Sequence, residues 1–486
     1  MTKNAHLMKW LAFLVLCMGD LMIVLDATIV NVALPSIRTD LLFTESSLAW
    51  VVNAYLLTFG GCLLLGGRLG DLFSHRRLFL IGISIFTFAS LICGLADTQW
   101  MLIAARALQG IGGAILSAVA LSLTMNLFPD GAERAKAMGV FGFISAGGGS
   151  IGVLLGGVLV NSFDWHWIFL VNIPVGIILV ALSLWLLPKG HVAPESRHLD
   201  IAGAFLVTSS LMLAVYSIVN GNEAGWLSLQ TLGLFALSLV LMASFILVES
   251  KIKVPLVPLS LFKIKSVTYS NIVAVLWAAA MFASFFLSAL YLQLVLQYPP
   301  LLVGLAFLPT NVIMAAFSLG LSAKIVMRFG IRWPLSLGLG AASLGLFLFG
   351  LAPVDGNFLI HVLPGMILLG IGAGIAFNPM LLAAMSEVPE NESGLASGLV
   401  NTSFMMGGAL GLAILASLAA ARTHSLLASG VDQTLALNSG YHVAFIVGAL
   451  AGLVAAVVSF VFLNVAAPKD ASATAEGGVP QDAVTH

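Results

Sequence analysis

The feature that most restricts the fold of this chain is a series of long apolar segments along nearly its whole length. Fourteen of them have the length that an α-helix needs to cross a hydrocarbon core of ~30 Å, roughly 18–25 residues. They lie at approximately 9–34, 48–67, 78–96, 101–126, 136–160, 166–187, 200–220, 230–249, 268–295, 303–325, 333–351, 358–385, 396–420 and 441–464. Only 8% of the residues are charged, against about 25% in soluble proteins. The sequence therefore predicts an all-α integral membrane protein, because lipid excludes open sheets and irregular backbone.

The lysines and arginines indicate which side of the membrane each connecting segment faces. If the N-terminus is inside, 17 of the 20 fall in cytoplasmic segments, and the exceptions are Arg38, Arg106 and Arg422. An excess of lysine and arginine in the connecting segments marks the cytoplasmic side of the membrane. We therefore expect a multi-pass protein of a bacterial inner or plasma membrane, with both termini in the cytoplasm. The first apolar run is too long for a signal peptide, so it is expected to stay as a span.

A weak internal repeat suggests how the helices group. GRLGDLFSHR (Gly67–Arg76) and AKIVMRFGIR (Ala323–Arg332) share a basic and apolar rhythm, and each connects two helices on the predicted cytoplasmic side. They imply two six-helix bundles, at 1–187 and 268–465. Parallel repeats of this kind are related by an axis along the membrane normal.

The remaining parts of the chain follow from this division. Residues 188–267 would be two inserted transmembrane helices with their linkers, at the periphery of the protein. Asp200 and Glu249 would then lie at the cytoplasmic surface. Residues 466–486 are polar and rich in small residues, so we expect a disordered cytoplasmic tail.

Two opposite charges lie deep inside the predicted helices. Asp26 is in LDATIVNVALP, and Arg106 is in LIAARALQGIGGA. A charge near the bilayer centre costs at least ~2.5–3.5 kcal/mol, which makes it a functional-site hypothesis by default. A purely structural Asp that hydrogen-bonds inside the bundle is the alternative. At 1.5 Å rise per residue, Asp26 lies roughly 13 Å below Pro35 and Arg106 roughly 9 Å below Trp100. Pairing at this common depth would lower the cost of burying both.

Two further polar residues belong to the same pair of helices. Gln109 lies one turn after Arg106 and shares its face. Asp20 is six residues before Asp26, so it is rotated about 120° away and does not share the face of Asp26. It is either a second proton or cation site or a residue that faces a neighbouring helix, and both interpretations stay open.

The segment Leu25–Pro35 resembles the end-of-helix-one signature of the fourteen-span drug:proton antiporters, a family of the major facilitator superfamily. The resemblance covers nearly the whole chain. It implies a proton-coupled secondary transporter that exports hydrophobic or cationic small molecules by alternating access, with Asp26, Asp20 and Arg106 as proton-coupling candidates. It also implies a monomer without enzymatic activity or cofactor, whose partners are substrate, protons and membrane lipid. The net charge of −1 argues against a nucleic-acid partner.

Two other motifs resemble that family. The segment Gly67–Arg77 is similar to the loop motif between helices two and three, which implies a charge latch that helps to hold the outward-facing state. The latch candidates are Gly67, Arg68, Asp71, Arg76 and Arg77. FISAGGGSIGVLLGGVL resembles the antiporter motif of helix five, where Val153 replaces the usual Pro. Its glycines have the spacing that lets helices approach closely, at Gly148, Gly152, Gly156 and Gly157.

The substrate cavity is expected to be apolar, with polar groups scattered singly. The candidates are Asn31, Asn53, Gln109, Asn271, Gln293, Asn311, Asn378 and Asn401, together with Phe404 as an apolar wall. A transporter of a specific polar metabolite, such as a sugar, amino acid or siderophore, would need more polar groups and is the alternative. The three cysteines have no metal-ligand spacing, so no metal is predicted. There is no Walker-type loop, which argues against ATP as the energy source.

Overall fold

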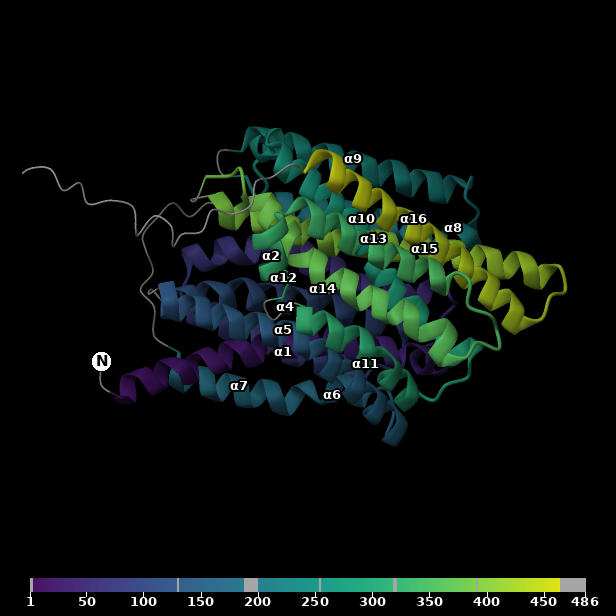
Figure 1. Ribbon diagram of the computed structural model, residues 1–486, viewed down its shortest axis with the longest axis horizontal. Coiled ribbons are helices and arrows are strands. Elements are labelled where there is room, and N and C mark those ends of the chain that lie inside the picture. Colours follow the sequence, from purple (N-terminus) through teal and green to yellow (C-terminus); the bar gives the residue numbers. More distant parts are fainter. Residues whose placement is uncertain are drawn as a thin grey trace, which may run out of the picture.

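The computed structural model describes residues 3–128, 131–187, 200–252, 255–317, 321–389 and 392–463. Within these residues the chain forms helices joined by short segments, and it forms no β-strand. Figure 1 shows most of the helices running side by side along the long axis of the molecule. This arrangement satisfies the backbone hydrogen bonds within each segment, as a lipid solvent requires. The predicted tail at 466–486 lies outside the described residues.

The first part of the chain, purple to blue in Figure 1, packs into one group of helices. These are α1 (Lys3–Asp40), the 3-10 helix η1 (Ser47–Ala49), α2 (Trp50–Leu72), α3 (His75–Gly94), α4 (Gln99–Leu127), α5 (Gly131–Ser162), α6 (Trp167–Leu170) and α7 (Asn172–Leu186). Within this group α4 packs on α2 and α3, α1 packs on α5, and α3 packs on α7.

The last part of the chain, green to yellow, forms the second group. These are α10 (Lys265–Leu290), which continues as the π-helix η3 (Tyr291–Val295), α11 (Pro300–Ala316), α12 (Ser322–Phe329), α13 (Arg332–Phe349), the π-helix η5 (Phe358–Val362), α14 (Leu363–Met385), α15 (Ser393–Ala428) and α16 (Gln433–Phe462). The two groups meet mainly where α5 packs on α11 and where α2 packs on α15.

In the sequence, the two groups are separated by α8 (Ile201–Ala224), α9 (Leu229–Lys251) and the short η2 (Leu259–Lys263). Helix α8 packs on α2 of the first group and on α15 of the second, and α9 packs on α8. Figure 1 places α9 along one edge of the molecule. Its outward side chains are large and apolar, for example Leu239 at 68% exposure, as expected of a helix that faces lipid.

The expected number of fourteen spans is not confirmed. The described residues contain twelve helical segments that are long and apolar enough to cross a membrane. Two shorter apolar helices accompany them, Gly148–Ser162 within α5 and Pro300–Ala316. The two expected spans that are missing from the twelve are those at α5 and α11. The side chains of several residues in the first half of α5, and all of residues 318–320 after α11, lie outside the described part.

Several helices begin or end beyond the apolar run that predicts them. Helix α2 continues to Leu72, so most of the segment expected as a loop between helices two and three is helical. Helix α16 begins at Gln433 rather than near 441, because Asp432 caps it by accepting from Thr434 N at 2.9 Å and Leu435 N at 3.3 Å. Apolar runs predict the membrane-embedded part of a helix, while capping residues set its true ends.

Asp200 and Glu249, expected at the cytoplasmic surface, are buried rather than exposed. The two residues are only 7% and 3% exposed. Asp200 is the N-cap of α8, and Glu249 lies in the last turn of α9. The chain after α9 folds back so that Val257 N donates to Glu249 Oε2 at 3.1 Å, and this return covers the carboxyl group.

Candidate functional site

The centre of the first helix group is an ion pair between α1 and α4. Asp26 is 0% exposed and Arg106 is 1% exposed. Arg106 Nη1 donates to Asp26 Oδ2 at 2.5 Å. The pairing expected from their common depth is therefore present in the structure. Both charges are removed from solvent, so each depends on the other for compensation.

Two neutral residues, Gln109 and Asn172, complete the hydrogen bonding of the Asp26 carboxylate, and Ser90 lies behind them. Gln109 Nε2 donates to Asp26 Oδ1 at 2.6 Å and Asn172 Nδ2 donates to the same oxygen at 3.1 Å. Gln109 Nε2 also donates to Ser90 Oγ at 2.8 Å. The carboxylate thus accepts from α4 twice and from α7 once, with Ser90 of α3 behind these donors. We name Asp26, Arg106, Gln109, Ser90 and Asn172 the Asp26 network.

Arg106 is also held by groups other than Asp26. Its Nε donates to the carbonyl oxygen of Val51 at 2.9 Å, and its Nη1 donates to Gln109 Oε1 at 2.6 Å. The guanidinium carbon lies 4.4 Å from the centre of the Tyr55 ring, within the range of a cation–π contact. The position of Arg106 is therefore fixed by α2 and α4 independently of the carboxylate.

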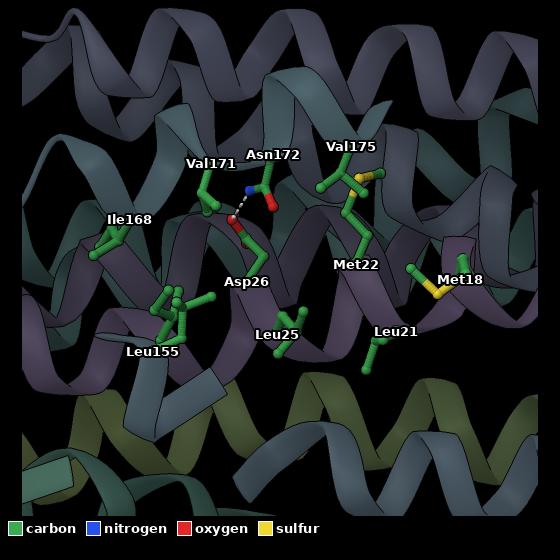
Figure 2. A pocket seen from close by; sticks show the side chains of 11 residues that line it. Met18, Leu21, Met22, Leu25, Asp26, Leu155, Ile168, Val171, Asn172 and Val175 are labelled. Atoms are coloured by element: carbon green, nitrogen blue, oxygen red, sulfur yellow. Dashed lines mark hydrogen bonds between the residues drawn. The ribbon is translucent and has the colours of Figure 1, made fainter. Parts of the chain in front are cut away.

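A small pocket adjoins the network between α1, α5, α6 and α7. Figure 2 shows Asp26 and Asn172 next to each other in its lining, with their hydrogen bond drawn. They are its two polar residues, and the others are Met18, Leu21, Met22, Leu25, Ile29, Leu155, Ile168, Val171 and Val175. An acid that borders an apolar pocket suits a site that handles protons near a hydrophobic ligand.

Sequence reasoning found part of this network and missed the rest. Asp26, Arg106 and Gln109 were all candidates. Ser90 and Asn172 were not, although Asn172 lies in DWHWIFLVNIPVG, a segment rich in aromatic residues near a helix end. The sequence feature that could have identified Asn172 is its amide side chain, which lies in an apolar run without another polar side chain for several residues. Asp20, the other acid of α1, is buried at 7% exposure.

The helix-five glycines lie at close helix contacts. A Cβ on Gly148, Gly152 or Gly156 would come within 2.8 Å of Leu21, Thr28 or Ile29 of α1. A Cβ on Gly157 would lie 2.9 Å from the carbonyl oxygen of Pro300 in α11. Helix α5 therefore packs tightly on α1 along one face and on the second helix group along another.

The latch candidates lie at the end of α2 and the start of α3. Gly67 and Arg68 are in the last turns of α2, and Arg76 and Arg77 are in the first turn of α3. The Arg76 guanidinium donates to the carbonyl oxygen of Leu184 in α7. Arg77 is exposed, and the side chain of Asp71 lies outside the described part.

Some cavity candidates hydrogen-bond within the protein. Gln293 Nε2 donates to the carbonyl oxygen of Val32 at 2.9 Å and so joins the second helix group to α1. Ser403 Oγ donates to Asn271 Oδ1 at 2.6 Å, which joins α15 to α10. Asn31 and Asn401 donate to carbonyl oxygens of their own helices.

Other candidates have polar atoms without partners. Asn53 and Asn311 are 0% and 1% exposed, yet both amide atoms of Asn53 and the Asn311 nitrogen lack a hydrogen-bond partner among the described residues. Phe404 packs between the rings of Phe282 and Phe377, each with its centre 5.7 Å away, and Asn378 is half-buried. Buried amides without partners are the polar groups most able to bind a ligand or water.

One acidic residue outside the spans lies where the two helix groups meet. Glu45 follows α1 and has its Oε1 3.5 Å from Arg38 Nη2. Burial raises the pKa of Glu45 above its ordinary value, although Arg38, His424 and Thr423 act in the opposite direction. A titratable carboxyl group therefore lies against the end of α15.

The described residues contain no group of three or more His, Cys, Asp or Glu side chains that could hold a metal ion.

Comparison of the chain with known proteins agrees with the geometry of a transporter. Residues 16–412 match the family described as Major Facilitator Superfamily. The chain is 36% identical over 464 residues to a puromycin resistance protein of Streptomyces alboniger, covering 94% of this chain and 92% of that protein. It is 35% identical to a cephamycin export protein of Amycolatopsis lactamdurans, covering 88% of each. A bacterial homologue of the human lysosomal transporter Spinster, solved in an inward-facing conformation, shares the fold with a TM-score of 0.66 at 15% identity, covering 94% of this chain and 97% of that one.

Proposed function

The chain belongs to the major facilitator superfamily, and we propose that it exports hydrophobic or cationic small molecules across the membrane in exchange for protons. Relatives of this chain are named for resistance to antibiotics or for their export. The observation that carries the proposal is the Asp26 network, since its acid is fully buried, paired with Arg106 and adjacent to an apolar pocket.

The contacts of Arg106 support proton coupling at Asp26. A proton on Asp26 would remove the charge that compensates the guanidinium. Arg106 would keep its bonds to Val51 and Gln109 and its contact with the Tyr55 ring. The carboxyl group can thus change its charge without leaving the arginine wholly uncompensated. Asp26 would then bind a proton from outside and release it inside as the transporter alternates. Asp20 is the second candidate.

We also propose the topology that the sequence suggests. It comprises fourteen spans with both termini in the cytoplasm, counting α5 and α11 as spans. The 32 residues of α5 support the first of these, and α11 followed by α12 supports the second. The helix groups then correspond to bundles at 1–187 and 268–465, with 188–267 as the insertion and 466–486 as a tail. Gly67, Arg68, Asp71, Arg76 and Arg77 would form the latch.

The substrate is proposed to bind between the bundles. Asn53 and Asn311 would supply unpaired amides there, one from α2 and one from α11. Phe404 would supply an apolar wall. Few polar groups and a large apolar lining favour broad acceptance of hydrophobic compounds over recognition of one polar metabolite.

Everted membrane vesicles with a pH-sensitive dye test the proposal. Puromycin, a cephamycin and a quaternary ammonium compound are added in turn to energised vesicles from cells without their own pumps. At least one should release protons from wild-type vesicles. Asp26→Asn keeps the size of the side chain but cannot titrate, so it should abolish this release while substrate binding persists. Asp97→Asn, at an exposed acid, should behave as wild type.

Two results would contradict the proposal. Proton release at the wild-type rate from Asp26→Asn vesicles would exclude Asp26, and its loss in Asp20→Asn alone would identify the other acid. Proton release by a sugar, amino acid or siderophore alone would favour the polar-metabolite alternative.

A further inference from the structure

Two buried carboxyl groups meet where α8 begins and α9 ends, and they belong to neither the Asp26 network nor the proposed cavity. Asp200 and Glu249 are 7% and 3% exposed. Each uses one oxygen in a hydrogen bond. Asp200 Oδ1 accepts from Gly203 N at 2.7 Å, and Glu249 Oε2 accepts from Val257 N at 3.1 Å. The other oxygens, Asp200 Oδ2 and Glu249 Oε1, have no hydrogen-bond partner in the part of the chain that the structure describes.

These two oxygens converge on one point beside Gly203. A Cβ on this glycine would lie 2.3 Å from Asp200 Oδ2 and 2.6 Å from Glu249 Oε1. The small size of glycine therefore leaves the space in which the two carboxyl groups face each other. An unpaired oxygen from each group points into that space, at a site more than nine-tenths buried on both sides.

No described cation compensates this pair. The charged residues on the surrounding elements include Glu223 on α8, Lys251 on α9, Lys263 on η2, Arg68 on α2, and Glu392 and Arg422 at the two ends of α15. No ion pair within 4.0 Å among the described residues includes Asp200 or Glu249. Lys251 and Lys263 are exposed. Two adjacent ionised carboxylates without a cation would repel each other and lose hydration, which costs several kcal/mol for each buried ion.

We propose that Asp200 and Glu249 form a proton-binding site, in which Glu249 carries one proton on Oε1 and donates it to Asp200 Oδ2. The helix ends decide which residue holds the proton. Asp200 caps the N-terminus of α8, where the helix dipole and the Gly203 N–H stabilise a negative charge. Glu249 lies in the last turn of α9, where the dipole opposes one. The proton forms one O–H bond, on Glu249 Oε1, and the negative charge that remains is on Asp200.

The site ties three parts of the chain together. Asp200 begins α8, Glu249 ends α9, and Val257 belongs to the segment that leads to the second helix group. Loss of the proton would leave two negative charges beside Gly203. The contact between α8 and α9 would then weaken as the pH rises on the side of the membrane where α8 begins and α9 ends. The inserted pair would thus respond to pH separately from Asp26.

Infrared difference spectroscopy on the purified full-length protein tests the proton directly. At neutral pH the spectrum of wild type minus Glu249→Gln should contain the C=O band of one protonated carboxyl group. When Glu223→Gln, at an exposed glutamate of α8, takes the place of the wild-type protein in this difference, the band should remain. Asp200→Asn keeps the cap but removes the like charge, so the band should be lost at a lower pH than in the wild-type protein. Absence of the band from the wild-type difference spectrum would overturn the proposal.

The pH dependence of stability gives a second readout. The side-chain amide introduced by Glu249→Gln can still donate to Asp200 but cannot lose a proton. The apparent melting temperature of wild type in detergent should therefore fall relative to this variant as the pH is raised from about 6 to about 9. Glu223→Gln should follow the wild-type curve. Parallel curves for wild type and Glu249→Gln would overturn the proposed site.

Discussion

Arg106 donates to Asp26 at 2.5 Å across 80 residues of sequence, and this pair joins the first and fourth helices of the chain. Because both side chains are buried, removal of one partner takes away the opposite charge that compensates the other, although Arg106 keeps its bonds to Val51 and Gln109 and its contact with the Tyr55 ring. Asp26→Asn and Arg106→Gln should each destabilise the protein, by about 3–5 kcal/mol in the absence of compensation. The double variant should cost less than the sum of the two. Apparent melting temperatures in detergent measure this cycle, and strict additivity would show that the two charges are not coupled.

Close packing of α5 on α1 predicts opposite effects at two neighbouring glycines. A Cβ on Gly152 would lie 2.1 Å from Thr28 Oγ1 and 3.0 Å from the carbonyl oxygen of Leu25, so Gly152→Ala must push the helices apart. Overpacking of this kind costs about 1–3 kcal/mol. The nearest atom to a Cβ on Gly149 is 3.5 Å away, which is ordinary contact. Gly149→Ala should therefore be neutral or stabilise by up to about 1 kcal/mol. Equal melting temperatures for the two variants would contradict the helix contact.

The central ion pair could be predicted from the sequence, while its neutral partners could not. Asp26 and Arg106 stand out because lipid makes each charge expensive, and a fixed helical rise gives their depths. Ser90 and Asn172 carry no such cost, and only the packing of α3 and α7 directs them toward Asp26. The same limit explains why the burial of Glu249 could not be predicted. Its place at a helix end predicted exposure, but the chain after α9 folds back over it, which hydropathy does not record.

Reporter fusions test the proposed topology of the inserted helices. Gly190 precedes α8, and Gly225 ends the helix with φ of 87° in the exposed link to α9. If α8 crosses the membrane, fusions at the two positions should report opposite sides, with Gly190 in the cytoplasm as the distribution of lysines and arginines predicts. A third fusion at Lys251 should report the same side as Gly190. The same side for Gly190 and Gly225 would show that α8 does not span the membrane.

The buried carboxyl group of Glu45 predicts a pH-dependent contribution to stability. Burial raises its pKa in the folded protein, so the folded state holds this proton more tightly than the unfolded chain does. The stabilising contribution is fully present below the unfolded pKa of about 4.3, and it is lost as the pH rises through the folded value. Glu45→Gln removes the titration. Relative to wild type, this variant should therefore gain stability as the pH rises through that window. Melting curves over a pH series measure the difference, with Asp97→Asn, at an exposed acid, as the control that should show none. A relative gain for Glu45→Gln as the pH falls would mean that the attraction of Arg38 outweighs burial and lowers the pKa of Glu45 instead.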